Sequence, residues 1–438
     1  MSNTRTFRAV SVGLVVMLAT VAAACGRSDD TSSSGGGDGG SNGTTANGGT
    51  AAPPPVSAGF DGSTITVGAI SPLTGRAAVI GTPLTAGNQV YFDALNAKGG
   101  VAGRYQVKLE SLDSKYEQQT AVQQFQSSKD KVAMYVQVLG TAIVDATLPQ
   151  LETDGLLAGP ASLDAFWVRK PNLMPIGGPY QIQVINGMDY AVRNLDAKDK
   201  KLCALTQDDP YGETALAGLE YANEQNGMTL TSQATFKGGD TDFTAQVNQM
   251  QGDGCEIIVL AGLPTEAGGI LGASATRNFT PQWMGVSPNF VLGFAENAAL
   301  GAYMSEHFIL MSEGPQWGDE SVPGMKQMLA DIASYAPDQK PDIYFAFGYA
   351  QAWAATQILE KAAADGDLSP AGVLKASEEI SELTFEGLIG DYTYGPVADR
   401  NPPRESTVFA VDPTLPAGLR ALETNFASQA AQDFTFEE

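Results

Sequence analysis

The chain of 438 residues is poor in the side chains on which most catalysis and metal binding depend. It has one histidine, His307, and three cysteines, Cys25, Cys203 and Cys255. A lone histidine with no second ligand at a recognisable spacing excludes the common zinc motifs. No Gly-x-Ser-x-Gly, P-loop or Gly-x-Gly-x-x-Gly pattern opens a helix after a predicted strand. We therefore predict a protein that is not an enzyme and that uses no metal or cofactor.

Basic residues are also scarce, with 25 Lys and Arg against 49 Asp and Glu and a formal net charge of −24. Such a surface repels nucleic acid, and no basic cluster in the sequence reverses this. We predict no nucleic-acid partner, and solubility is the simplest role for the acidic surface. Hydrophobic residues make up 43% of the chain, which is enough for a packed fold.

Long apolar runs are absent apart from one at the N-terminus. Arg5 and Arg8 precede a mostly apolar run over residues 9–24, which is shorter than the roughly 20 residues of a bilayer span. This is typical of an export signal. The residues "VAAAC" at its end resemble a bacterial lipobox, with Ala22 in place of the usual leucine. We predict a lipoprotein signal peptide over 1–24 and lipidation of Cys25; the alternative is a plain secretory signal cleaved after Ala24.

The segment that follows Cys25 is rich in Gly, Ser, Thr, Asn, Asp and Pro. Such a composition cannot bury enough apolar surface to offset the loss of chain entropy. We predict that residues 25–62 form the lipidated cysteine and a disordered tether, which would span roughly 30 Å as a flexible coil. The expected localisation is the extracytoplasmic face of the cell membrane, with the lipid as the anchor.

From residue 63 onward, short β-branched runs alternate with helical stretches, which indicates parallel sheets covered by helices. "STITVGAISPLTG" reads as a strand and a loop, and "PLTAGNQVYFDALNAKGG" places Val90, Tyr91, Ala94 and Leu95 on one helical stripe that ends at Gly99. A second set of units begins near residue 200 with "KKLCALTQDDPYGE" and repeats the order of the first. The fold class that follows is α/β, with two doubly wound lobes.

In sheets of this kind, ligands bind beyond the carboxyl ends of the strands. The sequence places six loops there, and nearly all contain Gly or Pro: 71–75, 139–142, 159–162, 208–212, 262–266 and 286–290. Residues of these types are also ordinary turn formers. Six such loops in register favour a binding site between the lobes.

Cys203 and Cys255 each stand at the start of a predicted strand. An exported protein permits a disulfide between them, but neighbouring parallel strands seldom meet disulfide geometry. A disulfide and two separate buried thiols are both open at this point.

The chain resembles the solute-binding proteins of ABC importers with the type I periplasmic-binding fold, in the branch of leucine/isoleucine/valine-binding proteins. The resemblance rests on "ITVGAISPLTG", "GNQVYFDALNAKGGVAGRYQVKLESLDS", "TQDDPYGE", "DFTAQV" and "CEIIVLAG" and covers about residues 64–412. It implies two lobes joined by three crossovers near 176–180, 304–309 and 385–392. Lobe 1 would comprise 63–177 and 308–388, lobe 2 would comprise 178–307 and 389–412, and 413–438 would be a C-terminal extension of open role.

The resemblance also implies the function. The protein would close on a small organic solute of the amino-acid, amide or carboxylate class and deliver it to a membrane permease and its ATPase. The alternative is a receptor of the same fold that senses a ligand and signals to a regulatory partner. The segment 341–366 would be a helix that returns to lobe 1, with Trp353, Ile358 and Leu359 in the core.

By position in the family, the solute would be bound by residues at the strand ends of both lobes. The resemblance assigns this role to Ser71, Thr74, Gly140, Thr141, Ala161, Ser162, Tyr211, Leu263 and Ser287. Relatives that bind α-amino acids usually carry an acid where this chain has Ser287. A buried ammonium without that partner is costly. Either Glu266 or Asp209 replaces the acid, or the solute is not a standard amino acid, and we favour the second; Phe166, Trp167, Tyr180 and Phe290 are candidates for a more apolar lining.

Overall fold

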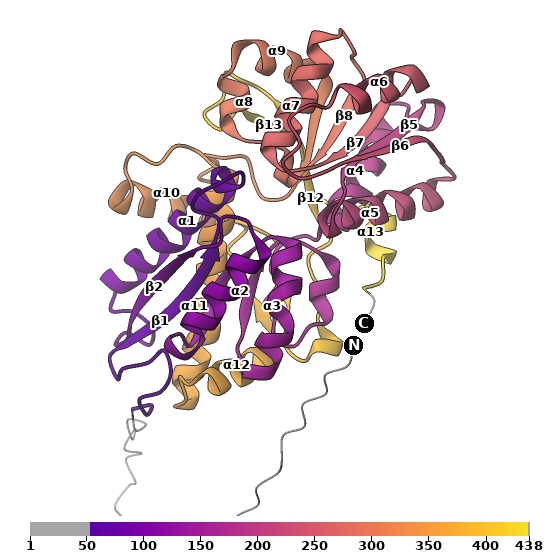
Figure 1. Ribbon diagram of the computed structural model, residues 1–438. Coiled ribbons are helices and arrows are strands. Elements are labelled where there is room, and N and C mark those ends of the chain that lie inside the picture. The colour runs from indigo at the N-terminus through magenta and orange to yellow at the C-terminus, as the bar shows by residue number, and fades with distance from the viewer. Residues whose placement is uncertain (1–52, 437–438) are drawn as a thin grey trace, which may run out of the picture. The chain divides into compact units, whose positions relative to one another are not determined.

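The protein is described by a computed structural model that covers residues 53–436 (Figure 1). The predicted signal peptide, the predicted lipidation site Cys25 and most of the predicted tether lie outside the described residues. The described residues contain two large sheets, each with its own helices, and one two-stranded ribbon.

The first lobe is built on a four-stranded sheet in the order β2-β1-β3-β4. All its pairings are parallel. The strands are β1 (Thr64–Ser71), β2 (Gln106–Asp113), β3 (Met134–Leu139) and β4 (Ala158–Ala161), and the helices between them are α1 (Ala78–Ala97), α2 (Gln118–Ser128) and α3 (Thr141–Asp154). Three later helices and a two-stranded ribbon share its hydrophobic core: α10 (Pro323–Tyr335), α11 (Ile343–Asp365), α12 (Pro370–Glu379), β10 (Glu382–Leu383) and β11 (Tyr392–Thr393).

The central contact of this lobe is between α1 and α11, which lie side by side in Figure 1. Glycine permits their close approach, because a Cβ on Gly87 would lie 2.2 Å from the carbonyl oxygen of Phe345. The amide of Asn88 donates a hydrogen bond of 2.6 Å to the carbonyl oxygen of Gly348. The expected helix over 341–366 thus packs in lobe 1.

The second lobe is built on a seven-stranded sheet in the order β13-β12-β9-β8-β7-β5-β6. The strands β5 to β9 are parallel, and β12 and β13 are antiparallel additions at one edge. Their bounds are β5 (Leu202–Gln207), β6 (Leu230–Phe236), β7 (Ile257–Ala261), β8 (Gln282–Val286), β9 (Phe308–Ser312), β12 (Ser406–Val411) and β13 (Leu419–Phe426). The helices are α4 (Tyr180–Asn194), α5 (Pro210–Asn226), α6 (Thr244–Asp253), α7 (Pro264–Thr276), α8 (Leu292–Glu296), α9 (Ala298–His307) and α13 (Gln429–Asp433).

Two of the three expected crossovers lie later in the chain than predicted. The first agrees with 176–180, because Ile176 packs in the core of lobe 1 and Tyr180 in that of lobe 2. The second follows β9, whose five residues are buried and four of which pair with β8, so 308–312 belongs to lobe 2 and not to lobe 1. The third follows Arg400, which donates a hydrogen bond to the carbonyl oxygen of Leu173 in lobe 1.

The boundaries at both ends of the predicted globular part also change. The tether was predicted to extend to residue 62, but Phe60 is buried, pairs with Ile65 and stacks edge-on against Tyr105 at 5.1 Å. The predicted extension 413–438 is part of lobe 2, because β13 pairs with β12 and Ala431 and Phe436 are buried in the core that contains α4.

Cys203 and Cys255 form a disulfide, with their Cα atoms 5.9 Å apart. The strands β5 and β7 are parallel neighbours, but Cys255 precedes β7 by two residues and so lies outside the ladder. Gly254 adopts the left-handed conformation with φ of +73° immediately before it. The turn there gives the two cysteines a geometry that two paired residues of a parallel ladder seldom reach.

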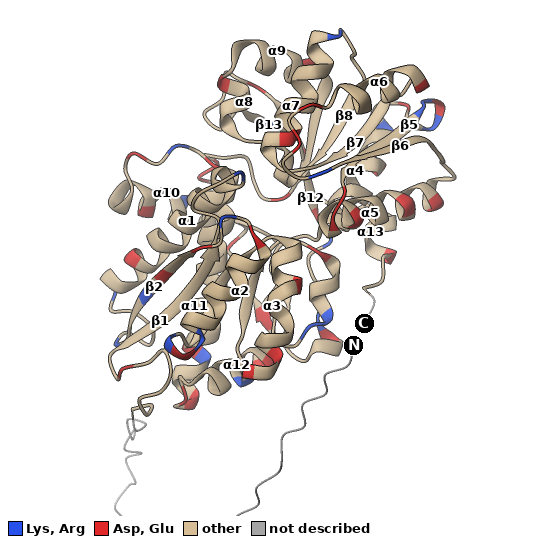
Figure 2. Cartoon of the chain, in the orientation of Figure 1, with Lys and Arg blue, Asp and Glu red and all other residues tan. Residues whose placement is uncertain are grey.

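Charged residues occur mostly in helices and loops, and acidic residues occur in both lobes (Figure 2). Within residues 53–436, no helix is both long enough and apolar enough to cross a bilayer. Over the same residues, no group of three or more His, Cys, Asp or Glu side chains is placed to hold a metal ion.

Candidate functional site

A cavity of about 120 Å³ lies at the carboxyl ends of strands from both sheets. Its lining includes residues of the loops after β3, β4, β5, β7 and β8, together with the segment after β9. The lining contains no lysine or arginine, and Glu313 is its one acidic residue. The cavity is therefore predominantly apolar, with neutral hydroxyl groups as its main polar feature.

Seven of the nine residues predicted to bind a solute line this cavity. They are Gly140, Thr141, Ala161, Ser162, Tyr211, Leu263 and Ser287. Because the carboxyl ends of parallel strands meet at one edge of a sheet, this grouping follows from the strand order.

The N-terminus of α3 contributes the first polar group. Gly140 stands at the N-cap with φ of +110°, and a Cβ there would lie 2.7 Å from the ring of Tyr116. The Oγ1 atom of Thr141, in the first turn, is buried and has no hydrogen-bond partner. The first N–H groups of a helix have no partner within it, and the helix dipole favours an anion there.

Tyr211 contributes the second polar group, from the start of α5. Its ring packs edge-on against Tyr180 at 5.1 Å, and its hydroxyl is buried without a partner. Burial raises the pKa of Tyr211 well above its usual value. The hydroxyl therefore stays protonated and is available as a donor to a solute.

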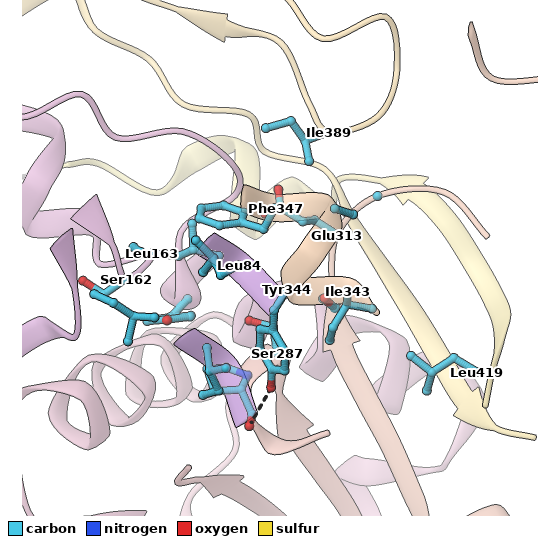
Figure 3. A pocket seen from close by; sticks show the side chains of 18 of the residues that line it. Leu84, Ser162, Leu163, Ser287, Glu313, Ile343, Tyr344, Phe347, Ile389 and Leu419 are labelled. Carbon is cyan, nitrogen blue, oxygen red and sulfur yellow. Dashed lines mark hydrogen bonds between the residues drawn. The ribbon is translucent and has the colours of Figure 1, made fainter. Parts of the chain in front are cut away.

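Two further hydroxyls are placed by local contacts. The Oγ of Ser162 accepts a hydrogen bond of 2.9 Å from the indole N–H of Trp167, which leaves the serine proton free to donate. Ser287 begins the 3-10 turn Ser287–Asn289 after β8, and its N–H donates to the side chain of Gln183. Both residues are labelled around the cavity in Figure 3.

Ser71 and Thr74, the other two residues predicted to bind a solute, do not line the cavity. Ser71 is fully buried in lobe 1, where it donates to the carbonyl oxygen of Gly81 and accepts from Gln137. The exposed Thr74 donates a hydrogen bond of 2.6 Å to the carboxylate of Asp113. Both hydroxyls are used inside lobe 1.

Neither acid considered as a replacement at position 287 lines the cavity. Asp209 caps α5 by accepting from the N–H of Gly212 and also accepts from the side chain of Gln207. Glu266 forms an ion pair with Arg76 at 3.0 Å. Of the four aromatic candidates, Tyr180 lines the cavity, Trp167 positions Ser162, Phe166 is exposed and Phe290 is in the core of lobe 2.

Glu313 is a cavity residue that the sequence did not reveal. It follows β9, and its Oε2 accepts a hydrogen bond of 2.7 Å from the N–H of Gly178 in the first crossover. Its Oε1 is buried without a partner, and a Cβ on Gly177 would lie only 2.4 Å from it. The carboxyl group is thus directed at the first crossover, and Gly177, with φ of +74°, leaves room for it. Burial raises the pKa of Glu313 to about 7, against a smaller lowering by the Gly178 hydrogen bond.

This raised pKa predicts a pH dependence of stability. The folded protein binds a proton at Glu313 between the usual pKa of 4.5 and about 7, so Glu313 destabilises the fold increasingly as pH rises through that window. Glu313→Gln should remove this effect. Between pH 4.5 and pH 8, we expect the free energy of unfolding of the variant to rise by about 1–3 kcal/mol relative to that of the wild type. Urea unfolding of both proteins at the two pH values measures this change. If the difference in free energy of unfolding between variant and wild type is the same at both pH values, the prediction is contradicted.

A second group of missed residues forms an apolar wall. They come from distant segments: α10, the segment before β11, β12, and the turn leading into β13. They are Met325, Leu388, Ile389, Phe409, Ala417 and Leu419. No local sequence pattern distinguishes these side chains from ordinary core residues.

The two lobes are joined beside the cavity by polar contacts as well as by the crossovers. Arg76, in the loop before α1, pairs with Glu266 of α7, and its guanidinium lies 4.8 Å from the ring centre of Tyr116. The hydroxyl of Thr265 donates to the carbonyl oxygen of Arg76. Tyr344 of α11 donates a hydrogen bond of 2.8 Å to the carbonyl oxygen of Phe290 in lobe 2.

The sequence profile of the periplasmic binding proteins matches residues 64–415. The chain belongs to this family. The predicted resemblance and the two-lobed type I fold are confirmed. Members of the family bind solutes and are not enzymes, as predicted.

Relatives of known description agree with this assignment. A Leu/Ile/Val-binding protein homologue from Brucella melitensis is 26% identical over 210 residues, which is 47% of this chain and 56% of the relative. An amino-acid-binding protein from Pseudomonas aeruginosa is 25% identical over 50% of this chain and 59% of its own length. The chain thus matches a little over half the length of these relatives.

Solved structures share the fold over most of the chain. A fatty acid ABC transporter substrate-binding protein from Thermomonospora curvata has a TM-score of 0.80 and 23% identity, over 88% of this chain and 97% of its own. A branched-chain amino acid ABC transporter protein from Thermus thermophilus, solved with bound valine, has a TM-score of 0.73 and 16% identity, over 84% and 98%. At these identities the likeness establishes the fold.

Proposed function

We propose that the chain is the extracytoplasmic solute-binding receptor of an ABC importer and that its solute is a monocarboxylate with an apolar body. The observation that carries this proposal is the cavity, which combines the N-terminus of α3 and several hydroxyls with apolar walls and no basic side chain. Several preorganised N–H and O–H donors can hold a carboxylate without a counter-ion. The fatty-acid-binding neighbour from Thermomonospora curvata supports this solute class.

The size of the apolar body follows from the volume. A dry apolar cavity of roughly 150 Å³ accepts benzene, and this cavity measures about 120 Å³. A body of about six carbon atoms is therefore the size that would fill it. Solutes of the amino-acid, amide and carboxylate classes meet this requirement when they carry such a body.

The proposed partners are a membrane permease and its ATPase, which would receive the solute. The proposed location is the extracytoplasmic face of the cell membrane, with the lipid on Cys25 as the anchor and the segment after it as the tether. Support for the location comes from the sequence of residues 1–52, which lie outside the described residues.

An α-amino acid is the second candidate solute, favoured by the descriptions of the curated relatives. Its ammonium group would need an acidic partner, and Glu313 is the one acidic side chain of the lining. The Glu313 carboxyl group faces Gly177 and Gly178, so it would have to turn toward the solute. This requirement is why we place the monocarboxylate first.

A thermal-shift screen of the purified protein distinguishes the two solutes. Octanoate, hexanamide, leucine and phenylalanine are added in turn, and a true ligand at a hundred times its dissociation constant stabilises the fold by about 2.7 kcal/mol. We expect stabilisation by octanoate and none by the amino acids. Stabilisation by leucine alone would show that the solute is an α-amino acid and not a monocarboxylate. If no small solute raises the melting temperature, solute binding is rejected.

Tyr211→Phe tests the site within the same experiment. It removes only the unpartnered hydroxyl, and a lost hydrogen bond to a charged group should weaken octanoate binding about tenfold or more. Tyr190→Phe is the matched control, because Tyr190 belongs to the same lobe and does not line the cavity. Equal affinity in the wild type and Tyr211→Phe would remove Tyr211 from the site.

A further inference from the structure

Part of the apolar wall of the cavity is built by residues that lie beyond the end of the family match. The match ends at residue 415, and Ala417 and Leu419 line the cavity immediately after it. Leu419 begins β13, which pairs antiparallel with β12 in the register Val411 to Leu419. These two wall residues lie outside the matched family segment, whereas the other four lie within it.

Residues of the polar side of the cavity and Leu419 of the wall lie apart from one another. Ser162, one of the hydroxyl-bearing residues of the lining, and Leu419 lie at opposite sides of the close view. Ser287, Tyr344 and Ile343 lie between them (Figure 3). A solute whose carboxylate binds near Ser162 and the N-terminus of α3 would thus direct its apolar end toward Leu419.

Two contacts hold the wall in place. The side-chain amide of Gln316, in the second crossover, donates to the carbonyl oxygen of Leu419 at 2.8 Å and accepts from the N–H of Ala421 at 2.8 Å. Gly418 adopts φ of +68°, and a Cβ on it would lie 2.6 Å from the Cβ of Ala295. The turn into β13 is fixed on both sides, so Leu419, with 2% of its surface exposed, has a defined position.

We propose that Leu419, together with Ala417, is the end stop of the solute cavity and sets the length of the apolar chain that the protein accepts. This inference rests on the proposed function, because it assumes that the carboxylate end binds at the hydroxyl groups. It assigns a role in specificity to the segment 413–438. The physical basis is that each methylene buried against the wall strengthens binding about fourfold, while one that meets a rigid wall is excluded.

The test measures dissociation constants for straight-chain monocarboxylates from acetate to dodecanoate. For the wild type we expect affinity to rise about fourfold per methylene up to an optimum and then to fall. Leu419→Trp should move the optimum to shorter chains and weaken the longest binders about tenfold or more, with hexanoate changed by about twofold at most. Leu419→Ala should move the optimum to chains longer by about two or three carbons.

Controls separate this role from a structural one. Arg420→Trp adds a large side chain to the exposed side of the same strand and should leave the profile unchanged. Ala417→Leu adds apolar bulk to the same wall two residues away and should also reduce the chain length that binds most tightly. This variant keeps the test valid if Leu419→Trp fails to fold. An unchanged optimum in folded Leu419→Ala and Ala417→Leu overturns the inference, as does an equal loss of affinity at every chain length. Failure of every monocarboxylate to bind the wild type rejects the proposed solute class and this inference with it.

Discussion

Replacing both Cys203 and Cys255 with alanine should lower the free energy of unfolding by about 4 kcal/mol, because the bond closes a loop of 52 residues and loop-closure entropy then stabilises the folded state by about that amount. Alanine is the appropriate replacement, since both cysteines are buried and serine would add an unpaired hydroxyl. The measurement is urea unfolding of the protein followed by tryptophan fluorescence, to which Trp283 contributes from the core that contains the disulfide.

The matched control is the wild type reduced with dithiothreitol, which should unfold at the same urea concentration as the alanine variant. Reduction should leave the alanine variant unchanged. Equal stability of oxidised and reduced wild type would show that the bond contributes nothing.

Replacing Arg76 with alanine should weaken solute binding about tenfold to a hundredfold, because it leaves the Glu266 carboxylate buried in the closed protein without its cation. Glu266 is fully buried, its Oε1 also accepts from the N–H of Gly239 at 2.7 Å, and its Oε2 has no partner. Separation of the lobes would return the carboxylate to water, so the loss of Arg76 favours the open form and lowers the apparent affinity.

Arg104→Ala is the control for this prediction. Arg104 is also in lobe 1 and lies 4.7 Å from a tyrosine ring, that of Tyr105, as Arg76 lies against Tyr116. It has no bond to lobe 2 among the described residues. Titration calorimetry with the solute found in the screen should give wild-type affinity for Arg104→Ala. Adding Glu266→Gln to Arg76→Ala should restore much of the loss, and the prediction fails if Arg76→Ala binds as tightly as the wild type.

The sequence predicted those parts of the fold that depend on a short stretch of chain, namely the individual strands and helices. The stripe of Val90, Tyr91 and Ala94 is buried in α1 as expected, and the alternation of strands and helices indicated parallel sheets. One exception is β9. Its residues Phe308–Ser312 form a short apolar run after a helix, and periodicity alone does not distinguish a five-residue buried strand from a buried turn of helix.

The disulfide between Cys203 and Cys255 is a second feature that the sequence alone left open. The sequence showed an even pair of cysteines in an exported chain, and a regular parallel ladder argued against bonding them. The left-handed turn at Gly254 places Cys255 outside the ladder. The position of Cys255 depends on this turn, and residue types alone do not specify such a turn.

For the site, the sequence by itself determined the residues at the carboxyl ends of the strands, such as Thr141, Tyr211 and Ser287, because a parallel sheet brings those ends together whatever the rest of the chain does. Only the tertiary structure decided that Glu313 faces Gly178 and that Leu419 closes the cavity. Glu313 lies where the chain leaves lobe 2 and Leu419 lies where the chain has returned to it, so the neighbours of both residues depend on how whole lobes pack rather than on any local pattern.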